Sequence, residues 1–192
     1  MRPIGTPPVG WPEFDCTLPP GKDGKATDAP YNPARQFTGH PTLDGMLTIW
    51  HSAVTSAGPP SWEDLADKIW QPWSTSLLLV ELRGPTKPLR SVEAFPVATT
   101  LLGLPLFFKG ALPADTPQMK ELAEMARQVT ETRAMIPRIL PARTHADGAA
   151  VQPLVAGVPL APVPAGFWRG PIQRVLFAVA PPVRRRNAKA SG

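Results

Sequence analysis

The sequence has 192 residues but only one cysteine, Cys16, so it cannot form a disulfide within the chain. A single thiol is typical of a reduced setting, and we expect a cytoplasmic protein. Long apolar runs are missing as well, because no stretch reaches the length of a membrane span. The first residues also lack the apolar core of a secretion signal. These absences argue against a secreted or membrane-spanning protein.

Motifs of catalysis and cofactor binding are also missing from the sequence. No Gly-x-Ser-x-Gly segment and no glycine-rich phosphate-binding loop occurs. The three histidines, His40, His51 and His145, share no spacing that a metal ion requires, and we interpret His51 as a boundary residue of a helix. We therefore expect no catalytic residue, no metal ion and no cofactor.

Acidic residues are scarce near the C-terminal end. The formal net charge of the chain is +5, and four basic residues, Arg184–Arg186 and Lys189, follow Val183 with no acid among them. The remainder is nearly neutral, which argues against a nucleic-acid-binding face on a folded domain. Four charges give only weak, salt-sensitive contacts, so we expect a solvated, disordered tail over residues 183–192.

Proline is the abundant residue, with 27 in the chain, about 14% against a usual share of roughly 5%. Residues 1–41 contain nine prolines and five glycines and show no sustained apolar periodicity. We expect that segment to be disordered. Residues 42–182 carry the periodic patterns, so we expect one folded domain there.

Two helices are predicted at the start of this domain. Thr42 is the predicted N-cap of the first, which ends before Gly58-Pro59-Pro60. Its inner face consists of Leu43, Met46, Leu47, Trp50 and Val54. Ser61 is the predicted N-cap of the second, shorter helix, which ends at Pro72. The inner residues of that helix are Trp62, Leu65, Ile69 and Trp70.

The later patterns alternate between strands and helices. Thr116 caps the clearest helix, which ends near Arg133 or Ala134. Its predicted inner stripe includes Leu122 and Ala123, and its predicted solvated outer side includes Glu121, Glu124 and Gln128. Asp147-Gly148 is typical of a hairpin turn. The predicted elements are strands at 77–82 and 89–94, a short helix at 95–102, an apolar loop at 104–112 that should pack, and strands at 135–143, 150–160 and 172–180. The strand at 150–160 is predicted to be interrupted by Pro153 and Pro159. This order predicts an α+β fold in which an antiparallel sheet carries helices on one face.

The order of these elements and several short motifs resemble the PAS domain family, in particular its divergent bacterial members. The motifs are Leu47-Thr48-Ile49-Trp50, Gly58-Pro59-Pro60, Trp62-Glu63-Asp64-Leu65, Val129–Arg133, Pro153-Leu154 and Arg174-Val175-Leu176. The resemblance covers roughly residues 43–181. It implies a sheet of about five strands, with two strands, a helical crossover and then three antiparallel strands, preceded here by an N-terminal helical pair.

The resemblance also implies where a ligand would lie. The residues between the second strand and the long helix would line its cavity, and they are Phe95, Leu101, Leu104, Phe107 and Phe108. The alternative, that they are ordinary core, stays open. PAS domains that hold haem use a histidine on a central helix, and flavin photochemistry in this family uses a core cysteine. No histidine lies between Val92 and Arg143, and Cys16 precedes the domain, so we expect neither group.

The central strands are apolar on both faces, which a sheet with one wet face does not require. We therefore expect the face around Leu176 and either Leu77 or Leu78, together with Trp50, to be covered. The cover is the first helix, a second subunit or a protein partner.

Together these patterns predict a non-catalytic sensory or regulatory module that acts through a protein partner or a homodimer, with a small ligand as an option. Two alternatives stay open: a PAS-like protein that binds a small apolar ligand, and an enzyme of unrecognised type.

Overall fold

We describe the chain from a computed structural model, which covers residues 38–181 except 69–71, 85, 145–147, 149 and 164–171. The helical elements are α1 (Pro41–Ala53), α2 (Trp62–Ala66), a 3-10 turn η1 (Pro72–Ser76), α3 (Pro96–Leu102) and α4 (Pro117–Thr132). The strands are β1 (Leu77–Leu82), β2 (Arg90–Ala94), β3 (Gly110–Ala111), β4 (Ile136–Ile139), β5 (Arg143–Thr144), β6 (Ala150–Val151), β7 (Leu154–Val163) and β8 (Ile172–Ala180). The predicted tail at 183–192 and most of the predicted N-terminal segment at 1–41 lie outside the described residues.

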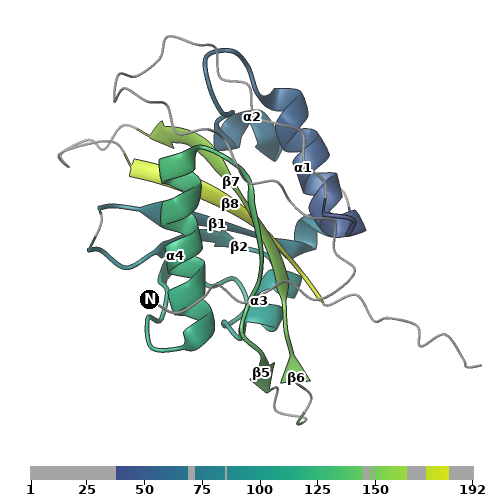
Figure 1. The fold of residues 1–192 in the computed structure, drawn as a ribbon, viewed down its shortest axis with the longest axis vertical. Coiled ribbons are helices and arrows are strands. Elements are labelled where there is room, and N and C mark those ends of the chain that lie inside the picture. Colours follow the sequence, from purple (N-terminus) through teal and green to yellow (C-terminus); the bar gives the residue numbers. More distant parts are fainter. Residues whose placement is uncertain are drawn as a thin grey trace, which may run out of the picture.

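Six strands form one antiparallel sheet in the order β3-β2-β1-β8-β7-β4 (Figure 1). The predicted α+β class with an antiparallel sheet is therefore confirmed. The last of the described strands, β8, lies in the middle of the sheet and pairs with β1 on one side and β7 on the other. The sixth strand, β3, consists of two residues within the predicted apolar loop and pairs with β2 at the edge.

Helices cover both faces of the sheet, because alternate residues of the central strands point to opposite sides. Val175, Phe177 and Val179 pack with α3 and α4, which crosses the strands in Figure 1. Leu176 and Ala178 pack with α1 and α2 on the other face. The two faces thus contribute to two separate apolar clusters.

The start of α1 differs from the prediction that Thr42 caps it. His40 is the N-cap, and its Nδ1 accepts from the Thr42 N–H at 3.3 Å. Pro41 occupies the first helical position, where a residue without an N–H loses nothing. Asp44 lies in the first turn, as predicted, and its carboxylate accepts from the N–H groups of Thr38 and Gly39 at 2.6 and 3.0 Å.

The second helix is shorter than predicted and ends at Ala66. Ser61 caps it as predicted, and a reciprocal capping box joins Ser61 to Asp64. Hydrogen bonds from the Ser61 backbone and hydroxyl lower the pKa of Asp64. Leu65 is buried and Trp62 half-buried, whereas Ile69 and Trp70 lie outside the described residues.

The two strands predicted at 135–143 and 150–160 are each broken. The first gives β4 and β5, and the second gives β6 and β7. Pro141 and Pro153 lie at the breaks and lack the N–H that continues a ladder, although Pro137 and Pro159 are accommodated within β4 and β7. The Leu140 N–H still donates to the Pro153 carbonyl at 2.9 Å, so β4–β7 and β5–β6 are segments of one hairpin. Most of its predicted turn lies outside the described residues.

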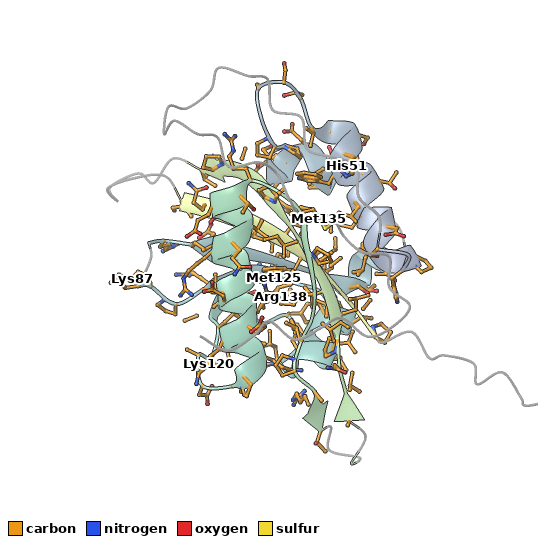
Figure 2. All side chains as sticks on the ribbon, in the orientation of Figure 1. His51, Lys87, Lys120, Met125, Met135 and Arg138 are labelled. Carbon is orange, nitrogen blue, oxygen red and sulfur yellow. The ribbon has the colours of Figure 1, made fainter. Side chains whose placement is uncertain are left out.

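The helix α4 is tied to the edge strand β4 by Arg138. Its guanidinium donates to the Glu121 carboxylate and, at 2.7 Å, to the Gln128 side-chain oxygen. Figure 2 shows Arg138 beside α4. The sequence had indicated a solvated outer side for this helix, but Glu121 and Gln128 hold the sheet edge.

Candidate functional site

The five residues predicted to line a ligand cavity are not gathered in one place. Phe95 is half-buried and packs with the cluster under α1. Leu101, Leu104 and Phe108 pack with the cluster under α4, on the opposite face of the sheet. Phe107 points into solvent and is 71% exposed. A ligand role for these residues stays a prediction.

The most unusual surface in the described part of the chain is formed by Leu106 and Phe107, which we call the apolar tip. Their exposed fractions are 62% and 71%, and they lie next to each other in the turn that leads to β3. Phe107 has a φ of 56°, in the left-handed region that bulky residues rarely occupy. Such strain persists only where the surrounding structure determines the conformation, and it concentrates at functional sites.

The residues on either side hold the apolar tip in place. Before it, Leu104 is buried, and its N–H donates to the Thr99 carbonyl at 2.8 Å. After it, the Phe108 carbonyl accepts from the Ser91 hydroxyl at 2.9 Å, while the Phe108 ring packs against the core. The ends of this apolar loop thus pack against the domain as predicted. Its middle does not pack and is held in solvent by the anchored ends.

The residues predicted as an interface are buried within the chain itself. Trp50 is on the inner side of α1 and packs in one cluster with Leu77 and Leu176 of the sheet, all three with exposed fractions of 0–1%. Leu78 lies on the other face among the α4 contacts. Of the three covers that the sequence left open, the first helix is the one present.

Two hydrogen bonds fix α1 and the segment after it to the sheet. Among the described strands, the pairing of β4 with β7 ends at Gly157, and no other described strand pairs with this edge of β7 beyond that point. The indole N–H of Trp50 donates to the Pro159 carbonyl at 2.8 Å, in a buried position. The Ala161 N–H donates to the Pro60 carbonyl, also at 2.8 Å. The α1–α2 segment therefore takes the place of a neighbouring strand along this edge.

A charged cluster lies at the end of the α1-covered face, and the sequence reasoning missed it. Glu81 is 5% exposed and stands opposite Arg174 in the β1–β8 register. One carboxylate oxygen accepts from Arg174 at 3.1 Å, and the other accepts from Arg83 at 2.9 Å. Glu63 of α2 adds a longer contact to Arg174, at 3.6 Å. The signal in the sequence was Glu81, the single acidic residue of the apolar strand β1, together with Arg174, the single basic residue of β8.

The charges around Glu81 lower its pKa. Burial alone would raise the pKa, but hydrogen bonds and charge from Arg83 and Arg174 outweigh it. Each charged group has a partner here, which suits a structural ion pair rather than an acid or base that exchanges protons near neutral pH.

Other chemistry-bearing groups do not converge. Among the described residues, no group of three or more histidine, cysteine or acidic side chains could hold a metal ion. Nor is any described helix long and apolar enough to cross a membrane. His40 serves as a helix cap, and the His51 ring lies edge-on to Trp50 with centroids 4.9 Å apart. His145 lies outside the described residues.

Comparison with known proteins adds one resemblance. No family model matches the sequence. No curated protein matches it either. Among solved structures, that of a fungal LOV domain photoreceptor is similar, with a TM-score of 0.40 and 17% sequence identity, over 56% of this chain and 72% of that chain. LOV domains belong to the PAS family.

Proposed function

We propose that this chain is a non-catalytic regulatory module of PAS-like fold, and that it acts by binding a protein through the apolar tip. One observation carries the proposal: Leu106 and Phe107 are adjacent, apolar and 62% and 71% exposed, in a turn anchored on both sides. The element order supports it, because two strands, a helical crossover and three antiparallel strands are what the PAS resemblance implies.

The chemistry of the apolar tip suits an interface anchor. Aromatic residues are enriched among the few that carry most of the binding energy of protein interfaces. A turn whose ends are already anchored loses less conformational entropy on binding than a flexible loop. The left-handed conformation of Phe107 costs free energy of folding. A role of the exposed ring in binding a protein would explain why the chain keeps this strained conformation.

Site-specific photo-crosslinking in the cells that express the protein tests this proposal. A benzophenone amino acid replaces Phe107 in one variant and the exposed Glu131 of α4 in a matched control. We expect a crosslinked product from position 107 that is weak or absent from position 131. A product of twice the chain mass identifies a second copy as the partner, and any other mass identifies a different protein.

Equal yields at the two positions, or no product at either, would contradict the proposal. A second arm measures purified protein by sedimentation velocity over a range of concentrations. If the product at position 107 has twice the chain mass, we expect self-association that Phe107→Ser removes. The surface control Thr100→Ser should leave it unchanged, because Thr100 is also exposed but polar.

A further inference from the structure

A hollow of about 400 Å³ lies between the β1–β2 turn and the outer side of α4. We call it the basic-rimmed hollow. Its volume is within the range of small-molecule sites, roughly 300–1,000 Å³. Figure 2 shows Lys87 on the turn and Lys120 on the helix. The apolar tip contributes no lining residue, so this site is separate from the proposed protein contact.

The floor of the hollow is apolar. Leu89, Leu112 and Met119 line it, and all three are also buried members of the cluster under α4. The hollow therefore opens directly onto the core, and an apolar group placed in it would leave water for a surface of aliphatic side chains.

The rim carries an excess of positive charge. Lys87 and Lys120 line the hollow, and neither has an ion-pair partner among the residues that the structure describes. Arg127 has one, Glu124 at 3.5 Å, but both side chains are substantially exposed, at 38% and 52%, so that pair is weak. Three cations against one acid leave a site that favours an anion.

A small residue, Ala123, lies among the α4 residues that line the hollow. Met119, Ala123 and Arg127 follow one another at four-residue spacing on α4 and all line it. Ala123, predicted in the inner stripe of this helix, packs against the core cluster but is only half-buried and also lines the hollow. A longer side chain at position 123 would occupy the space.

We infer that the basic-rimmed hollow binds an amphipathic anion, a small molecule with one carboxylate and a short apolar chain. The chain would lie on the apolar floor, and the carboxylate would meet Lys87 and Lys120. A neutral apolar molecule would gain no charge attraction from the exposed ammonium groups of Lys87 and Lys120, and a compact inorganic anion would leave the apolar floor in water. This inference goes beyond the proposed function and does not depend on it.

Titration calorimetry with sodium octanoate tests the inference on the full chain. We expect saturable binding of octanoate and at least about tenfold weaker binding of octan-1-ol and of inorganic phosphate, which lack the head and the chain respectively. The double variant Lys87→Ala/Lys120→Ala should weaken octanoate binding by about tenfold or more. Lys68→Ala is the matched control, since Lys68 is equally exposed but follows α2, and it should bind like the parent.

A steric pair gives an independent readout. Ala123→Phe should abolish octanoate binding by filling the hollow, whereas Ala123→Ser should retain it; circular dichroism and melting confirm that both are folded. The inference is overturned if octanoate does not saturate, or if the double lysine variant binds like the parent. It is also overturned if phosphate binds as well as octanoate. Binding to mixed phosphatidylcholine–phosphatidylglycerol vesicles gives a further outcome. If the parent binds these vesicles but not octanoate, and the double variant does not bind them, the ligand is a membrane surface and the inference of a free small molecule is overturned.

Discussion

At the scale of single residues, Phe107 combines two opposing properties. Its left-handed backbone costs about 1 kcal/mol or more, while its ring is 71% exposed and contributes little burial. Phe107→Gly should therefore raise the free energy of unfolding by about 1 kcal/mol, because glycine adopts this conformation without strain. Urea denaturation measures it. Phe107→Ala keeps the strain and should give no such gain, and a stabilisation by alanine equal to that by glycine would contradict the assignment.

The same change should remove function, if the apolar tip binds a protein as proposed. Glycine at 107 deletes the ring that would insert into a partner, so the more stable variant should be the one that no longer associates. A single substitution at position 107 would then raise the free energy of unfolding and weaken binding, which is the trade-off expected where backbone strain is part of a functional site.

Glu81 makes stability depend on pH. Its folded-state pKa is lowered from the ordinary 4.5, so its contribution is fully present above that value and is lost as pH falls through the lowered pKa. Glu81→Gln should cost roughly 1–3 kcal/mol at neutral pH, less than for a fully buried pair because Arg83 is 30% exposed. Chemical denaturation of both proteins should show the difference shrinking in acid. A difference that stays constant down to the lowest pH at which both remain folded would contradict it.

At the scale of elements, α4 has a strict inner and outer side. Leu122 is 0% exposed among core contacts, whereas Glu124 is exposed and pairs only with Arg127 and Gln128 on its own helix. Leu122→Asp should unfold the domain, because it places a charge in the apolar cluster. Glu124→Ala should change the free energy of unfolding by less than about 0.5 kcal/mol. Thermal melts of the two variants test the assignment, which equal effects would overturn.

The cover formed by α1 can be tested from the strand beneath it. Leu176 is 1% exposed and packs in the cluster with Leu43, Leu47 and Trp50. Leu176→Glu should detach α1 while the α4 side of the sheet keeps its packing, since Val175 and Phe177 face the other way. Hydrogen exchange should then rise in α1 before it rises in α4. A simultaneous rise in both helices would show that the two faces unfold together.

Most of these elements could be predicted from the sequence because their periodicity is strong. The stripe at Leu43, Met46, Leu47 and Trp50, and the alternation through β8, leave little choice of helix or strand. The N-cap at His40 was missed, since Thr42 is the commoner capping type and histidine acts here only through its Nδ1. The interruption at Pro153 could be predicted from the sequence, whereas the predicted interruption at Pro159 is wrong, because Pro159 lies within β7, and the break around Pro141 was not predicted.

At the scale of the whole molecule, the candidate sites were much harder to predict than the fold. Leu104 and Leu106 are the same residue type two positions apart, yet Leu104 is buried and Leu106 is exposed. The sequence pattern alone cannot distinguish them. That difference depends on a left-handed turn at Phe107. A glycine would have indicated such a turn in the sequence, but this position holds a phenylalanine. The basic-rimmed hollow joins Lys87 to Lys120 from elements that only tertiary folding brings together.

The central position of β8 also determines the order in which the protein is completed during synthesis. Of the described strands of this sheet it is the last to be synthesised, yet both β1 and β7 pair with it, and α1 packs against it. The sheet cannot be completed until residue 180 has emerged from the ribosome. The apolar side of α1 therefore stays exposed to solvent while most of the domain is translated. Such long-range closure is slow, and it exposes the nascent chain to chaperones and to aggregation. A chain truncated before β8 would lack the strand on which its first helix rests.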